Sequence, residues 1–277
     1  MHIRTPAVAG MFYSNEKKEL KKSIKDCFLH KFGPGRIPPS KIKKKIFGVI
    51  CPHAGYMYSG PIACHSFYAI SSDVPELFII IGPNHWGIGS SIATMKDCKW
   101  NTPLGDVEVD SETAEKISHI SEIIDIDYFS HTREHSLEVQ IPILQEMYSD
   151  FKILPISMIN QNKDTAKDIG MAIAKIVEKK KVMIIGSSDF THYEQNEFAH
   201  EQDMALIEPI LRLNVENFYR VLEDRNVSAC GYGAIASTML ACKELGATKG
   251  ELLKYATSGD ITGDINSVVG YGSIVFT

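Results

Sequence analysis

The stretch IFGVICPHAGY (residues 46–56) joins a short apolar run to a turn that contains proline, histidine and glycine. Two later stretches have the same design, LFIIIGPNH (residues 77–85) and VMIIGSSDFTH (residues 182–192). Their apolar parts are rich in isoleucine and valine without polar alternation, which is typical of strands buried on both faces. Glycine and proline at the ends allow the backbone to turn sharply. We therefore predict three buried strands, each followed by a tight turn.

Helical patterns separate the apolar runs along the chain. Two further strand-like runs cover residues 153–159 and 272–276, and helical patterns cover residues 17–28, 113–120, 165–178, 215–222 and 232–245. This alternation predicts an α/β fold, a three-layer sandwich with a mixed, mainly parallel central sheet and helices on both faces. The only linker-like stretch, residues 32–40, is too near the N-terminus to separate two domains. We expect one domain over residues 1–277.

The composition is that of a folded protein with no bias toward nucleic acids. Of the 277 residues, 44% are hydrophobic and 23% are charged, enough apolar surface to offset chain entropy. The net charge of −5 excludes an electrostatic case for nucleic-acid binding. The one basic run, Lys41 to Lys45, is expected to be a solvent-exposed segment that precedes a strand. No apolar run approaches the roughly 20 residues of a membrane helix, so no membrane partner is expected.

The cysteines and the start of the chain indicate a reducing compartment. Six cysteines are scattered without CxxC spacing, which argues against a disulfide scaffold or a zinc finger. Residues 1–13 lack the long apolar core of a signal peptide. We therefore expect a cytoplasmic protein.

The turns after the three strands carry residues suited to a shared site. In open α/β sheets, ligands bind beyond the carboxyl ends of the strands. The turns present His53, His85, and Asp189 with His192. One histidine after a strand is usually solvent-facing or hydrogen-bonded, but three turns of the same kind predict a common cleft.

Two other segments are candidates for the same cleft. Residues 131–140 are predicted to begin a helix in which His135 and Glu138, three apart, share a face. That pair suits a carboxylate that orients a histidine, an acid/base pair, or an exposed local contact. Cys230 precedes a predicted helix, whose dipole should favour a thiolate that acts as metal ligand or nucleophile; an inert buried thiol is the alternative. Cys51 and Cys64 are expected to pack in the core.

An ordered series of motifs resembles the Memo family. The motifs are RTPAVAGMFY (4–13), PHAGY (52–56), GPNH (82–85), TPLG (102–105), EHSLEVQ (134–140), SSDFTH (187–192), ACGYG (229–233), SGD (258–260) and VVGY (268–271). Each motif is weak alone, but the set covers nearly the whole chain in order. This family is related in fold to class III, LigB-type extradiol dioxygenases, α/β non-heme iron enzymes with two histidines and a carboxylate on the metal.

The resemblance implies a metal site with an unusual third ligand. His53 and His85 would be the imidazole ligands, and Cys230 would stand in place of the carboxylate. Asp189, His192 and His135 would line the cleft, with His192 as the acid/base group. A thiolate shifts metal preference from iron toward copper or zinc. The resemblance implies iron and the thiolate favours copper, so we expect iron or copper, with zinc as an alternative. Ring cleavage does not follow from the fold.

Three functions are compatible with these residues. The first is a metal-dependent redox protein, an oxidoreductase of the non-heme type with an unknown small-molecule substrate. The second is a non-enzymatic binding or signalling module that holds a peptide or a small anionic or aromatic ligand in the same cleft. The aromatic residues expected to stack on such a ligand are Tyr56, Tyr58, Trp86 and Phe190.

The third function is a thiol hydrolase. Cys230 would attack the substrate, His192 or His135 would serve as base, and Asp189 would orient that base. The resemblance also implies a protein partner from a radical-SAM system, with a role in assembling or modifying another protein.

Overall fold

The computed structural model describes residues 2–40, 44–177 and 180–277. Its strands are β1 (His2–Arg4), β2 (Gly48–Cys51), β3 (Leu77–Pro83), β4 (Ile92–Thr94), β5 (Cys98–Thr102), β6 (Gly105–Val109), β7 (Asp125–Ile126), β8 (Lys152–Met158), β9 (Val182–Ser187), β10 (His192–Glu194), β11 (Gly250–Thr257) and β12 (Val268–Phe276). Its helices are α1 (Lys17–Leu29), α2 (Tyr56–Ile70), α3 (Ser111–Ile120), α4 (Ile141–Met147), α5 (Lys163–Ile176), α6 (Asn196–Leu211), α7 (Val215–Asp224), α8 (Tyr232–Glu244) and α9 (Ser258–Thr262).

Within the described residues the strands form one twelve-stranded sheet, which confirms the predicted α/β fold. The main strand order is β1-β5-β6-β8-β3-β9-β2-β12-β10, with β11 paired to β12 and β4 and β7 beside β8. The central strands β6, β8, β3, β9 and β2 are parallel, whereas β12 runs antiparallel to β2. The sheet is therefore mixed and mainly parallel, and its parallel strands end at one common edge.

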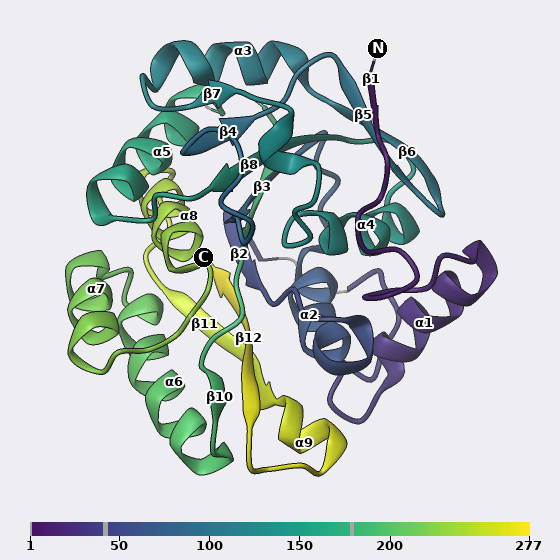
Figure 1. Cartoon of the computed structure of the whole chain (residues 1–277), viewed down its shortest axis with the longest axis vertical. Coiled ribbons are helices and arrows are strands. Elements are labelled where there is room, and N and C mark those ends of the chain that lie inside the picture. The colour runs from purple at the N-terminus through teal and green to yellow at the C-terminus, as the bar shows by residue number, and fades with distance from the viewer. Residues whose placement is uncertain (1, 41–43, 178–179) are drawn as a thin grey trace.

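Helices cover both faces of this sheet (Figure 1). Strand β3 shows why, because its successive side chains point to opposite faces. Leu77, Ile79 and Ile81 pack in a core with α5 and α8, whereas Phe78 and Ile80 pack in a second core with α1, α2 and α4. The predicted continuous apolar runs thus lie between two helical layers.

The predicted strands and helices correspond to elements of the structure, with shifted ends. The predicted strand 46–50 becomes β2, and the predicted helix 165–178 becomes α5. Its expected last residue, Glu178, lies outside the described residues, and so do residues 41–43 of the basic run. No helix in the described part of the chain is both long enough and apolar enough to cross a membrane.

A helical segment begins within residues 131–140 only at Glu138, so the predicted helical spacing of His135 and Glu138 is wrong. The backbone there forms two short 3₁₀ turns, Phe129–His131 and Glu138–Gln140, and the helix α4 follows them. His135 and Glu138 consequently do not form a pair on one helix face. The carboxylate of Glu138 is instead turned to the N-terminal segment.

Glu138 anchors the first residues of the chain through a buried ion pair with Arg4. The two side chains are 1% exposed, and Arg4 Nη1 lies 2.6 Å from Glu138 Oε2. The same carboxylate accepts the backbone N–H groups of Ala7 (2.7 Å) and Val8 (3.1 Å) and the hydroxyl of Tyr13 (2.6 Å). These donors explain the position of Glu138, because a buried carboxylate needs several hydrogen bonds and an opposite charge.

Arg4 in turn holds the loop that follows β7. Its Nε donates to the carbonyl of His131 at 2.7 Å, and its Nη2 donates to the carbonyl of Glu134 at 2.6 Å. The guanidinium also lies 4.0 Å from the ring centre of Trp100. Buried hydrogen bonds and the ion pair therefore hold residues 4–13 and 131–138 together.

Glu138→Ala should lower the free energy of unfolding by about 3–5 kcal/mol, because it leaves Arg4 buried without its partner. Urea denaturation followed by circular dichroism measures this loss. Glu112→Ala is the control, because Glu112 forms an exposed ion pair with Lys116 one helical turn away and should matter little. Similar small changes in both variants would contradict this account of the buried pair.

Candidate metal centre

The candidate centre lies at the edge of the sheet where β3, β9 and β2 end side by side. His53 follows β2 by two residues, and His85 follows β3 by two residues. Asp189 follows β9, which lies between those two strands. Cys230 comes from another part of the chain, two residues before α8, a helix that packs on β9 and β3. The parallel pairing thus brings distant residues to one place.

The three predicted metal ligands meet in the structure. One ligand atom from each of His53, His85 and Cys230 lies within 4.8 Å of the other two. Cys230 Sγ is 3.1 Å from His53 Nε2, and the rings of His53 and His85 are 5.2 Å apart at their centres. His53 is buried, Cys230 is half-buried and His85 is exposed. The geometry suits a shared ion, although metal binding itself stays a prediction.

The hydrogen bonds of His53 determine which ring nitrogen is free. His53 Nδ1 lies 3.0 Å from the hydroxyl oxygen of Ser187. That hydroxyl donates to the carbonyl of Ser136 at 2.6 Å and accepts from Gln140 Nε2 at 2.9 Å. Since its only proton is used, Ser187 accepts from His53 Nδ1–H. The lone pair of His53 is therefore on Nε2, which faces Cys230.

Glu134 determines which ring nitrogen of His85 carries the proton. His85 Nδ1 lies 2.9 Å from Glu134 Oε1, and the carboxylate also accepts the backbone N–H groups of His85, His135 and Ser136 at 2.6–2.9 Å. Burial opposes ionisation, but the hydrogen bond from His85 and the backbone donors hold the pKa of Glu134 at about 2. A carboxylate bound to Nδ1–H leaves the lone pair of His85 on Nε2, the atom that could bind a metal.

Glu134 was not among the residues predicted from the sequence, because helical spacing pairs His135 with Glu138, three residues apart. In the irregular loop, Glu134 is the residue beside the histidines, and its ligand atoms form a second group with His85 and His135 within 4.8 Å. Glu134 directly precedes His135 in the motif EHSLEVQ, and this position could have identified it as a candidate site residue.

Two histidines of the cluster, His53 and His135, are held in the neutral form. Burial, followed by the nearby His85, His135 and His192, lowers the pKa of His53 well below its usual value. Burial also lowers the pKa of His135 to about 4, although Glu134 acts in the opposite direction. The ring of His135 stacks on His85 with 4.5 Å between centres. Neutral imidazoles are the form that binds metals.

The expectation that Cys230 is readily a thiolate is wrong. Burial, and then the negative charge of Asp189, raise the pKa of the Cys230 thiol. The backbone N–H of Asp189, 3.4 Å from Sγ, does not offset these effects. Desolvation therefore outweighs the helix dipole, and an unassisted thiolate nucleophile is disfavoured.

Asp189 and His192 occupy different positions beside the cluster. Asp189 is buried, its Oδ1 accepts the backbone N–H of His53 at 2.8 Å, and burial raises its pKa to about 6. His192 Nδ1 lies 2.7 Å from the carbonyl of Phe190 and 3.0 Å from that of Ser228. Because both partners only accept, His192 carries a proton on Nδ1, and none of the described residues forms a hydrogen bond with its Nε2.

A cavity of about 610 Å³ opens beside His85 and His135. Its other lining residues are Ala7, Val8, Met11, Phe12, Trp86, Thr132 and Arg133. The Arg133 guanidinium lies 5.6 Å from the Trp86 ring centre. The expectation that Tyr56 and Phe190 stack on a ligand is wrong, because both rings are buried in the core and the Tyr56 hydroxyl donates to the carbonyl of Val139 at 2.7 Å.

All six cysteines are free. Cys51 and Cys64 are completely buried, which confirms that they pack in the core. The chain thus uses its one partly exposed thiol, Cys230, at the candidate centre.

Comparisons with known proteins agree with the motifs. A family model described as Memo-like protein matches residues 4–275. A MEMO1 family protein of Nitrosopumilus maritimus is 59% identical over 275 residues, 99% of each chain. A MEMO1 family protein of Methanocaldococcus jannaschii is 46% identical over 283 aligned residues, covering 99% of this chain and 98% of the relative.

A solved structure, an uncharacterized protein from Escherichia coli K12, is similar in fold. It covers 84% of this chain and 100% of its own length, with a TM-score of 0.58 and 11% identity, so it supports the α/β fold alone. The two full-length relatives and the matching family model carry the assignment: the chain belongs to the Memo family.

Proposed function

We propose that the protein is a metal-binding redox protein that holds one iron or copper ion between His53, His85 and Cys230. The observation that carries the proposal is the meeting of these three ligand atoms within 4.8 Å. Zinc is the alternative ion, because two imidazoles and one thiolate also suit zinc. The arrangement is similar to a two-histidine non-heme iron site in which a thiol replaces the carboxylate.

The donor set fits such an ion on physical grounds. Both imidazoles are fixed by hydrogen bonds at Nδ1, through Ser187 and Glu134, so that each presents a lone pair. The thiol of Cys230 loses its proton when a cation provides the opposite charge. A bound iron or copper ion supplies one-electron chemistry beside the open cavity.

The neighbouring residues have separable roles in this proposal. Asp189 is a positioning residue, because it holds the backbone of His53 rather than facing the cavity. His192 is the acid/base group, because its free Nε2 can accept a proton. His135 lines the cavity beside His85 and is neutral at physiological pH. We also place the protein in the cytoplasm, where a reducing environment keeps Cys230 unoxidised.

A second candidate function is supported by the cavity beside His85. Arg133 and Trp86 together offer a cation and an aromatic face on its wall. These groups suit an anionic peptide or small molecule, which a binding or signalling module would hold without turnover. A partner from a radical-SAM system, implied by the resemblance, stays a prediction.

Anaerobically prepared metal-free protein should take up about one equivalent of copper or iron. His53→Ala and Cys230→Ala should each retain less than about a tenth of that metal after gel filtration, because each removes one of three anchors. Elemental analysis measures the retained metal. His119→Ala is the matched control, because His119 is exposed on α3. Equal metal contents in wild type and both site variants would overturn the proposal.

Metal affinity should rise about tenfold per pH unit from about pH 7.5 to about pH 8.5, because binding releases one proton from a thiol whose pKa burial has raised. Competition with a chelator at each pH measures the affinity. Cys230→Ala has no thiol proton to release, so its weak residual binding should lack this slope. A wild-type affinity that does not change with pH would show that the thiol is not a ligand.

A further inference from the structure

A second cavity lies between α1 and α4, away from the candidate metal centre. Helix α2 connects the two regions, since it begins at Tyr56 near His53 and ends at Ile70, next to the cavity-lining Ser71. The helix has 15 residues and therefore spans about 22 Å. We call this second cavity the α1 groove; its volume is about 520 Å³.

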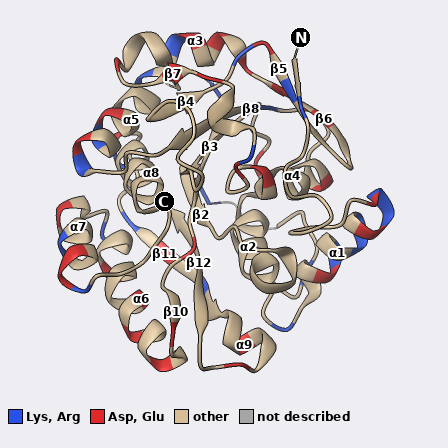
Figure 2. Cartoon of the chain, in the orientation of Figure 1, with Lys and Arg blue, Asp and Glu red and all other residues tan. Residues whose placement is uncertain are grey.

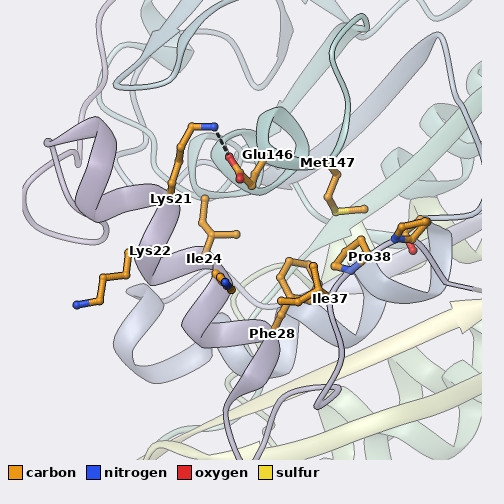
Figure 3. Close-up of a pocket in the computed structure, with 11 residues that line it drawn as sticks. Lys21, Lys22, Ile24, Phe28, Ile37, Pro38, Glu146 and Met147 are labelled. Atoms are coloured by element: carbon orange, nitrogen blue, oxygen red, sulfur yellow. Dashed lines mark ion pairs between the residues drawn. The ribbon is translucent and has the colours of Figure 1, made fainter.

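The α1 groove has a mainly aliphatic lining. The apolar residues are Ile24, Phe28, Ile37, Pro38, Pro39 and Met147, and the others are Lys21, Lys22, Lys25, Ser71 and Glu146. Figure 3 shows Ile24, Phe28 and Ile37 close together, with Met147 above them. The volume falls in the range of about 300–1,000 Å³ that small-molecule sites occupy.

Hydrogen bonds and an ion pair hold the walls of the groove in place. The backbone N–H of Ser40 donates to the hydroxyl of Ser71 at 2.6 Å, and that hydroxyl donates to the carbonyl of Tyr68 at 2.7 Å. The segment that carries Ile37 is thereby tied to the end of α2. On the other side, Lys21 and Glu146 form a 2.8 Å ion pair between α1 and α4 (Figure 3).

The groove also has an excess of positive charge, although the whole chain has a net charge of −5. Its three lysines face one glutamate, which Lys21 already pairs. Among the described residues, no ion pair involves Lys22 or Lys25. Lys22 and Lys25 are also three apart on one helix, so their like charges are neighbours and repel. An anion at this edge would relieve that repulsion.

We propose that the α1 groove binds an alkyl carboxylate of medium chain length. The alkyl chain would lie on Ile37, Pro38 and Met147, next to the buried Ile24 and Phe28, and the flexible methionine would adapt to it. The carboxylate would remain at the surface beside Lys22 and Lys25. Figure 3 shows the Lys22 ammonium directed outward from the apolar residues, as a surface headgroup requires.

The size and chemistry of the groove favour this ligand over an acidic peptide. The lining combines one apolar interior with one cationic edge, which matches a molecule with one tail and one charge. Each buried methylene should strengthen binding about fourfold. Affinity should therefore depend on both chain length and charge.

Calorimetric titration with decanoate, below its micelle-forming concentration, tests the proposal. Decanoate should bind once per chain, hexanoate more than tenfold more weakly, and decanol about fivefold more weakly. The double variant Lys22→Gln, Lys25→Gln should weaken decanoate about fivefold, whereas Lys116→Gln, on the remote α3, should not. Ile37→Glu should abolish binding; Ile37 is 45% exposed, so this variant should keep the wild-type circular dichroism.

Several results would overturn the proposal. They are no saturable decanoate binding, equal binding of decanoate and decanol, or decanoate binding unchanged in the groove variants. An acidic peptide that binds there and is not displaced by decanoate would also contradict it. Titration of His53→Ala makes the test independent of the metal site, because decanoate should bind this variant as tightly as wild type.

Discussion

Parallel pairing of β3, β9 and β2 is the constraint on which the candidate metal centre depends. Three adjacent parallel strands must end at the same edge, so the residues that follow them are brought together whatever their separation in sequence. The helix α8 then packs on β9 and brings Cys230 to the same edge. The Arg4–Glu138 pair fixes the loop that supplies Glu134 and His135. The fold thus positions the candidate ligands and their hydrogen-bond partners together.

Burial changes the ionisation of the side chains at this edge of the sheet. It lowers the pKa of His53 and raises the pKa of Cys230, and both shifts favour neutral side chains. The charge of Glu134 is balanced by several N–H donors, including His85 Nδ1–H. A cation would replace the Cys230 proton and bind two lone pairs that are already oriented. The same desolvation that argues against an unassisted nucleophile keeps the His53 lone pair unprotonated, whereas the Cys230 proton competes with the cation and must be released on binding.

The parts of the fold that the sequence predicted are those with a strong local signal. Continuous isoleucine and valine runs identified the central strands, and amphipathic patterns identified α1, α5 and α7. Helix α2 was not predicted, because it is buried on most sides and contains Pro61, so it has little amphipathic period. Glu134 was missed because its loop does not follow helical spacing. The pKa of Cys230 depends on tertiary burial, which the helix-dipole argument does not include.

The central claim is that two imidazoles and one sulfur bind the same ion. X-ray absorption spectroscopy at the K-edge of the bound metal tests this directly on the iron- or copper-loaded protein. The account predicts one sulfur and two imidazole nitrogens around the ion, with the sulfur signal lost in Cys230→Ala. A wild-type spectrum with no sulfur neighbour would contradict it.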